Sequence, residues 1–123
     1  MTMRNVLLSC FLLMTALAFA HHGLATFDVT TKVTVKGEVT DFHFVNPHCV
    51  VEFEVKDDKG QVKAWQGELG NPDRLTKKGW NAASLEAGDE VSVTGYRAKN
   101  GAALLWVTRI ASPKAKELVL EGR

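Results

Sequence analysis

The chain is poor in residues that bind soft metals or form cross-links, and most of these lie at its start. All three methionines and one of the two cysteines fall within the first 20 residues, at Met1, Met3, Met14 and Cys10. Cys49 is then the only sulfur-containing residue of the remaining chain, which excludes an intramolecular disulfide there. A soft Cu(I) site uses thiolate or thioether ligands, so the sequence disfavours one.

Neither sign of charge is in excess. The chain has 15 basic and 14 acidic residues, and Arg4 is the only one of these within the first 20 positions. The remaining 103 of the 123 residues therefore carry a formal charge of zero, and they contain no basic cluster. Because nucleic-acid binding requires a concentrated Lys and Arg surface, we expect no nucleic-acid partner.

Catalytic motifs are also missing. The sequence has no G-x-S-x-G motif, no C-x-x-C pair, no paired catalytic carboxylate motif and no phosphate-binding loop. We therefore expect a binding protein rather than an enzyme. A copper oxygenase is the enzymatic alternative, and a short chain disfavours it because little surface remains for a substrate.

Residues 1–20 have the pattern of a secretory signal peptide. Arg4 supplies a positive charge near the start, and an uncharged run of 15 residues ends in A-F-A at 18–20, the A-x-A pattern that signal peptidase recognises. A membrane span needs about 20 apolar residues, so this run is too short for one. We predict cleavage that leaves His21 first, and a bacterial protein that is periplasmic or secreted without a membrane span. The alternatives are a retained anchor and a different cleavage site.

Beyond this leader, apolar and polar residues alternate with the period of a β-strand in five segments. They are 32–39, 48–56, 61–69, 90–96 and 103–110. The second segment places Cys49 inward, whereas the third does not distinguish its two faces.

One short helix is predicted between the third and fourth strand segments. Asn71 can cap its start, and Pro72 suits its first position. Lys77 and Lys78 suit the last turn, and Gly79 can end the helix. The element order is therefore three strands, a helix and two strands.

A repeated pentapeptide indicates how the strands are arranged. V-T-V-K-G at 33–37 returns as V-S-V-T-G at 91–95, and glycine at the same offset suggests matching sharp bends in a small closed sheet. The element order is that of a five-stranded, Greek-key OB-type barrel, so we predict an all-β fold with one short helix. Another five-stranded antiparallel barrel or sandwich is the alternative. We expect the barrel at 21–110 and a loosely held C-terminal tail at 111–123; the alternative is that residues 118–120 of this tail dock on the barrel.

Several motifs resemble those of a family of small exported bacterial (proteobacterial) proteins of unknown function. They are His21-His22-Gly23, Asn46-Pro47-His48, E-L-G-N-P at 68–72, G-W at 79–80 and LEAGDEVSVTGYRAKNG at 85–101. The resemblance covers nearly the whole mature chain and departs at Gly23, where the family usually has serine. It strengthens the predicted fold and export and implies no established activity.

The four histidines are concentrated near the predicted mature N-terminus. They are His21, His22, His43 and His48. Imidazole is a common ligand of copper, zinc and nickel. After cleavage, the α-amine and imidazole of His21 can chelate one metal, and a second histidine completes a T-shaped "histidine brace", similar to those of exported copper carriers and copper oxygenases. Such a nitrogen site favours Cu(II), so we predict Cu(II) bound by His21 and His48, with His22 as the alternative partner.

Each histidine also has a purely structural interpretation. His21 and His22 can form a solvated N-terminus, and His48 can hydrogen-bond to backbone at the start of the second strand. Two phenylalanines flank His43, and a bulge there would turn both rings inward and His43 toward solvent. Two functions therefore remain: a periplasmic module that binds Cu(II) for transport, buffering or sensing, and a metal-free module that binds an unknown small ligand or a periplasmic protein.

Overall fold

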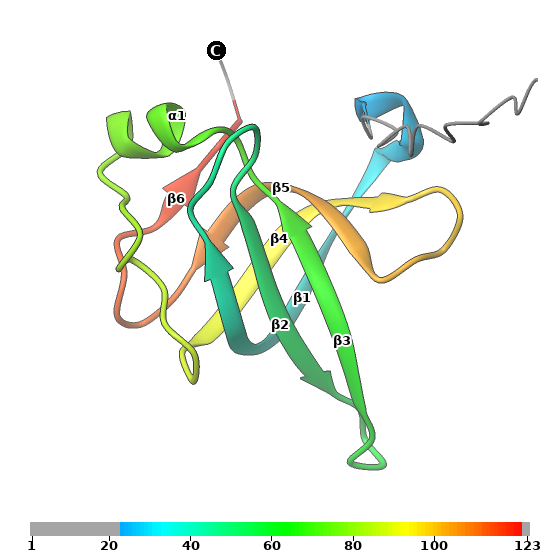
Figure 1. Cartoon of the computed structure of the whole chain (residues 1–123). Helices are drawn as coiled ribbons and strands as arrows, with labels where there is room; N and C mark the ends of the chain where they lie inside the picture. The colour runs from blue at the N-terminus through cyan, green and yellow to red at the C-terminus, as the bar shows by residue number, and fades with distance from the viewer. Residues whose placement is uncertain (1–22, 122–123) are drawn as a thin grey trace, which may run out of the picture.

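The strands of the molecule form a small closed barrel. The computed structural model describes residues 23–121 (Figure 1). Its main strands are β1 (Phe27–His43), β2 (Val50–Lys56), β3 (Val62–Glu68), β4 (Glu90–Ala98) and β5 (Leu104–Ala111). Neighbouring strands pair antiparallel in the order β3-β2-β1-β4-β5, and a parallel pairing of β3 with β5 closes the ring. This confirms the predicted all-β, OB-type barrel of five strands with one short helix.

β1 extends beyond the predicted segment 32–39 because it pairs with two other strands of the barrel. It has 17 residues, of which the first part pairs with β4 and the last part with β2. Glu38 pairs with both neighbours. Residues 28–31 are all exposed, so the alternation that marks a half-buried strand is absent there. The sequence pattern therefore could not indicate the start of β1.

The two V-x-V-x-G segments pair with each other across β1 and β4. Both of their glycines lie where two backbones approach closely. A Cβ on Gly37 would lie 2.3 Å from the Glu54 carbonyl oxygen, and one on Gly95 would lie 2.1 Å from that of Trp106. Only glycine permits this approach, which agrees with the sharp bends expected from the repeat.

Inward-facing side chains fill the barrel. As the alternation predicted, Cys49, Val51 and Phe53 are at most 1% exposed. In β3, Gly67 faces inward. The side chains of Val51 and Val107 occupy the space that a Cβ there would need, so the position requires glycine. The structure thus resolves the orientation of β3, which the sequence pattern left open.

The helix α1 (Pro72–Lys77) lies at one end of the barrel (Figure 1). The Asn71 side chain accepts a hydrogen bond from the Arg74 backbone N–H at 2.8 Å, which is the predicted N-cap. Gly79 follows the helix with φ of 87°, and Leu75 is fully buried. Within residues 23–121, no helix is long and apolar enough to cross a membrane.

The chain returns to the barrel after β5. A short strand, β6 (Leu118–Val119), pairs with β5. Leu118 and Leu120 are buried in the same core as the barrel side chains. Of the two possibilities considered for the C-terminal tail, docking therefore applies to residues 118–120.

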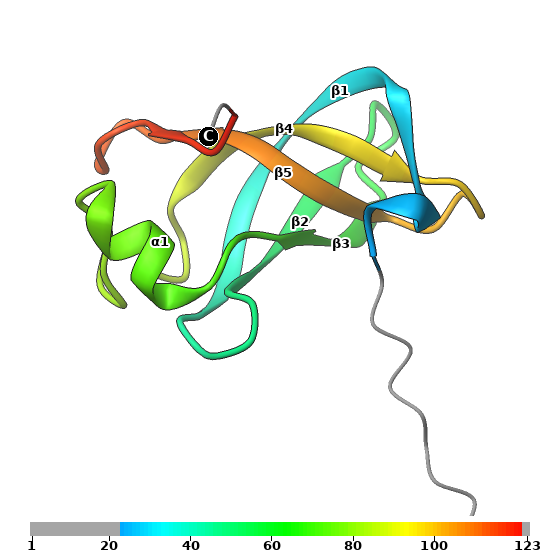
Figure 2. The same cartoon turned by 90° about the horizontal axis from the view of Figure 1, so that it is seen from above.

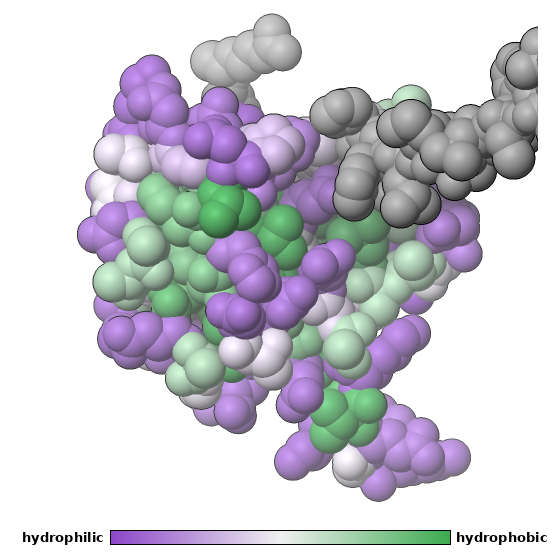
Figure 3. Space-filling model, viewed as in Figure 1, coloured by the Kyte–Doolittle hydropathy of each residue, from purple (hydrophilic) through white to green (hydrophobic). Residues whose placement is uncertain are grey.

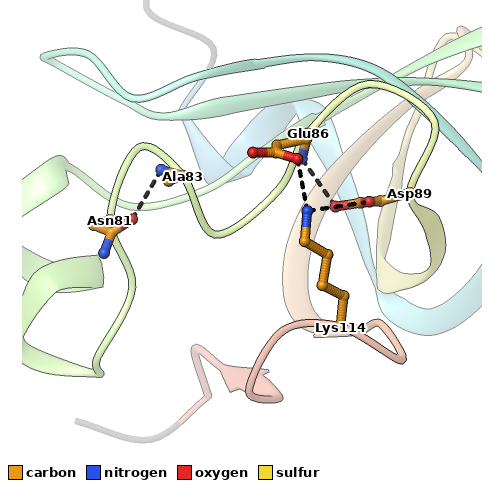
Figure 4. A network of polar contacts seen from close by, with 5 residues as sticks. All are labelled: Asn81, Ala83, Glu86, Asp89 and Lys114. Atoms are coloured by element: carbon orange, nitrogen blue, oxygen red, sulfur yellow. Dashed lines mark hydrogen bonds and ion pairs between the residues drawn. The ribbon is translucent and has the colours of Figure 1, made fainter.

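An ion pair links this returning segment to the loop between α1 and β4. Lys114 Nζ lies 2.6 Å from Glu86 Oε2 and 3.7 Å from Asp89 Oδ1 (Figure 4). The Glu86 carboxylate raises the pKa of the Lys114 amine. Within the same loop, the Asn81 side chain accepts a hydrogen bond from the Ala83 N–H at 2.8 Å. The ion pair therefore joins the loop to the C-terminal segment at the surface, and the hydrogen bond shapes the loop itself.

Candidate functional site

His48 lies two residues before β2, on a segment that hydrogen bonds hold against the end of β3. The Cys49 N–H donates to the Gly70 carbonyl at 3.0 Å, and the Leu69 N–H donates to the Cys49 carbonyl at 2.8 Å. The Cys49 side chain is buried in the core, whereas His48 is partly exposed. Its ring packs edge-on against Trp106 of β5, with centroids 6.3 Å apart and planes at 65°. His48 is therefore half-buried on a fixed backbone.

The N-terminal segment reaches the same tryptophan. The 3₁₀ turn η1 (Leu24–Thr26) leads into Phe27, whose buried ring lies 5.6 Å from that of Trp106. The Thr26 carbonyl accepts a 3.0 Å hydrogen bond from the Lys99 N–H, which ties η1 to the turn between β4 and β5 (Figure 2). Leu24 and Trp106 also line one cavity of about 300 Å³. Trp106 thus contacts both His48 and the N-terminal segment.

The other two predicted ligands, His21 and His22, lie outside the described residues. They directly precede Gly23, the first residue that the structure describes. Within residues 23–121, His48 is therefore the one member of the predicted ligand set that the structure places.

A second group of possible metal ligands, which we did not predict, lies on β1 and β2. His43 Nε2 is 3.4 Å from a carboxylate oxygen of Asp41 and 3.4 Å from one of Glu52. One ligand atom from each of the three residues lies within 4.8 Å of the others. The three side chains are 41–59% exposed. Exposed groups at these distances form ordinary surface ion contacts, so the cluster alone does not indicate a metal.

A β-bulge explains how this group assembles. The pairing register of β1 and β2 shifts between Val39 and Asp41, which places Asp41 opposite Glu52. The shift also turns Phe42 and Phe44 toward the core. The expected bulge is therefore present and His43 is a surface residue, although the sequence did not indicate its two carboxylate neighbours.

Glu68, at the end of β3, is a further polar residue that the sequence analysis did not single out. It lies opposite Val50 of β2 and beside Trp106 of β5. Its Oε2 atom is buried and has no hydrogen-bond partner among the described residues. Recognising it required the orientation of β3, which the sequence pattern did not supply.

A groove of about 690 Å³ lies away from these residues, beside the β2–β3 hairpin. Its charged lining residues have both signs: Lys36, Glu38, Glu54, Lys56 and Glu90. Val62, which also lines the groove, is 54% exposed. Figure 3 shows apolar surface near the tip of this hairpin, separated by polar side chains from the other apolar surface of that face. His48, the predicted ligand residue that falls within 23–121, does not line this groove.

A family model matches residues 10–105, which is most of the chain. The chain belongs to DUF6152, a family of unknown function. Membership of DUF6152 confirms the expected relationship to a family without an established activity. Among curated proteins, none matches this DUF6152 chain significantly.

Two solved structures resemble this DUF6152 protein. One is the mitochondrial single-stranded DNA-binding protein Rim1 of S. cerevisiae, with a TM-score of 0.52 and 15% identity over 70% of this chain and 96% of that one. The other is the N-terminal domain of PriB from Thermoanaerobacter tencongensis, with a TM-score of 0.43 and 22% identity over 66% and 93% of the two chains. At its low identity, the likeness to Rim1 supports the OB-type fold alone.

Proposed function

We propose that this DUF6152 protein is an exported, periplasmic module that binds one Cu(II) ion through a histidine brace. In this proposal the signal peptide, residues 1–20, is removed, and the α-amine and imidazole of His21 chelate the ion. His48 supplies a third nitrogen. His22 is the alternative third ligand, although an adjacent residue reaches the same ion only with difficulty. The module would serve copper transport, buffering or sensing.

The observation that carries the proposal is the contact of Trp106 with both His48 and Phe27. The rings of Phe27, which follows η1, and of His48 therefore pack against the same side chain of β5. Two residues span at most about 7 Å, so the link from Gly23 to His21 is too short to carry a cleaved N-terminus far from η1. The proposal requires that the His21 amine, within this reach of Gly23, come to the same ion as the His48 imidazole.

The available donors favour Cu(II) over other copper states. An amine and two imidazoles form an all-nitrogen set, which suits Cu(II), the divalent ion with the highest general affinity for such ligands. Cys49 does not compete, because its thiol is buried and burial raises its pKa. The mature chain has no methionine. The donors of the proposed site are therefore hard to borderline ligands, which suit the oxidised ion, Cu(II).

The groove beside the β2–β3 hairpin supports a second candidate, a metal-free binding module. Its mixed charges suit a polar small ligand or a peptide of a periplasmic protein. Rim1 is described as a single-stranded DNA-binding protein, but the neutral mature chain and the glutamates of the groove disfavour a nucleic-acid ligand here. If the mature protein binds no metal, this module is the better account.

The proposal is tested by Cu(II) titration of the processed protein and two variants. His48→Ala removes a ligand and is expected to weaken binding at least tenfold, or about 1.4 kcal/mol. His43→Ala is the matched control, because it removes a half-exposed histidine near the same strand pair. Its affinity is expected to stay within about twofold of the unsubstituted protein.

The His43→Ala control also distinguishes the histidine brace from the Asp41–His43–Glu52 group as the metal site. A large loss with His43→Ala and none with His48→Ala would move the metal to the Asp41–His43–Glu52 group and contradict the brace. Circular dichroism on all three proteins would exclude unfolding as the cause.

A further inference from the structure

The first half of β1 has one free edge. Up to Glu38, β1 pairs with β4 alone among the described strands, and only from Glu38 onward does it also pair with β2. The Val39 N–H donates to the Asp89 carbonyl just before β4, so the odd-numbered residues of this stretch direct their backbone groups toward β4. Because these directions alternate along a strand, the N–H and C=O groups of Thr34 and Lys36 point toward the free edge. An unpaired edge of this kind is a template for another strand.

The groove beside the β2–β3 hairpin reaches this edge. It is lined by Lys36 of β1 and, across the gap where β1 no longer pairs with β2, by Lys56 of β2 and Val62 of β3. The hairpin projects beyond the rest of the barrel (Figure 1). The groove volume of about 690 Å³ lies within the range of about 300–1,000 Å³ that is usual for ligand sites. An unpaired strand edge therefore adjoins a space that can hold a ligand.

Three glutamates stand side by side in the same groove. Glu38 of β1 lies directly opposite Glu54 of β2 and also opposite Glu90 of β4, and all three line the groove. Side chains at opposed positions lie about 5 Å apart, and like charges there destabilise a sheet. Within residues 23–121, none of these three carboxylates takes part in an ion pair. A single cationic side chain brought into the groove would meet uncompensated negative charge.

The charges on the edge disfavour a second copy of the chain as the added strand. Regular pairing of β1 with β4 begins at Lys32, so the regular part of the free edge is 32–36. In a two-fold pairing of two copies about Thr34, the middle of this part, Lys32 of each copy would stand opposite Lys36 of the other. Like charges at directly opposed positions cost stability. A different protein, with a neutral edge and one basic residue, fits better.

We propose that this groove binds an extended peptide segment of another protein, which adds a strand to β1 along 32–36 and places a lysine or arginine beside Glu38. Backbone hydrogen bonds to Thr34 and Lys36 supply affinity, and the row of glutamates selects the basic side chain. Apolar side chains of the segment cover Val62, which is 54% exposed. The inference rests on the second candidate function, whose ligand class it names, and does not depend on copper binding.

Fluorescence anisotropy of a labelled peptide tests the proposal, with the processed protein in a buffer that contains a metal chelator. In the probe, threonine alternates with valine around one central lysine, and we expect saturable binding. The same peptide with glutamate in place of the lysine is expected to bind at least about tenfold more weakly, because it brings like charges together.

Backbone methylation of the lysine probe tests whether it binds as a strand. Two N-methylated probes each lack every second N–H group, one in each register, and both keep all side chains. In one of them the methyl groups face β1, so at least one of the two probes is expected to lose about tenfold or more in affinity. This comparison needs no variant of the protein.

Charge reversal in the protein tests the row of glutamates. Glu38→Lys is expected to weaken binding of the lysine probe at least about tenfold, whereas Asp58→Lys, the matched control, is expected to stay within about twofold. Asp58 lies in the turn of the same hairpin and does not line the groove. Both side chains are exposed, so both variants are expected to fold, which circular dichroism checks.

Four results would overturn the inference. They are no saturable binding of the lysine probe, equal binding of the glutamate probe, unchanged binding of both N-methylated probes, and equal effects of the two charge reversals. A dimer in light scattering that the lysine probe dissociates would assign the edge to a second copy and overturn it as well. Because these measurements contain no copper, their failure leaves the copper site standing, and a failed copper titration leaves this inference standing.

Discussion

The barrel suppresses the reactivity of the Cys49 thiol. Its side chain is fully buried, and burial raises the pKa of its thiol, so little reactive thiolate exists near neutral pH. If the protein is exported and processed as proposed, its one remaining cysteine could otherwise form mixed disulfides. In this fold the thiol behaves as a small apolar core group.

We predict that a thiol reagent labels folded Cys49 at least about 100-fold more slowly than the urea-unfolded chain at the same pH, because labelling requires an opening of the barrel. Absorbance from an aromatic disulfide reagent measures both rates. Labelling of the folded protein within the mixing time would show that Cys49 is accessible and would contradict the packing of β2.

At the scale of single elements, Gly95 fixes the crossing of β4 and β5. A Cβ there would meet the Trp106 carbonyl oxygen at 2.1 Å, and this neighbour is backbone that cannot turn away. We predict that Gly95→Ala lowers the free energy of unfolding by about 1–3 kcal/mol in a urea titration. Trp106 fluorescence is also expected to change, because its backbone must shift.

Gly23→Ala is the matched control for this substitution. Gly23 has φ of −65°, and a Cβ at this position would meet no atom within 4 Å, so alanine should change stability by less than about 0.5 kcal/mol. Equal changes in the free energy of unfolding for the two substitutions would mean that the close backbone approach at Gly95 does not cause the destabilisation.

Local patterns in the sequence were enough to predict most elements. Alternation placed Cys49 inward, Asn71 and Gly79 bounded the helix, and the repeated glycines marked the bends. Each of these depends on neighbours a few residues away, or on the period of one strand. They are features that a single sequence records directly.

The pairing of distant strands was not predictable in the same way. His48 and Trp106 are brought together by the register of three strands and by the parallel closure of β3 on β5. Glu68 became notable only once β3 had an orientation. His48 was selected from its sequence context as a ligand candidate, whereas its aromatic neighbour and the adjacent buried carboxyl group required the tertiary structure.

For the molecule as a whole, the barrel and both ends of the segment 23–121 form one packed unit. Phe27 anchors the start of β1 on Trp106, and Leu118 and Leu120 return the other end of the chain to the core. The proposed copper site depends on this arrangement, because one ligand comes from the N-terminus and another from the loop before β2. Processing at residue 20 would then both release the protein and create its metal ligand.

The most direct test of this account compares Cu(II) binding by the correctly processed protein, whose intact mass shows the loss of residues 1–20, with the same protein carrying one extra N-terminal alanine. The alanine moves the free amine away from His21 and leaves every side chain in place. We predict one tightly bound Cu(II) in the processed protein and loss of at least about tenfold in affinity, or 1.4 kcal/mol, in the extended one. Equal binding by the two proteins would contradict the histidine brace.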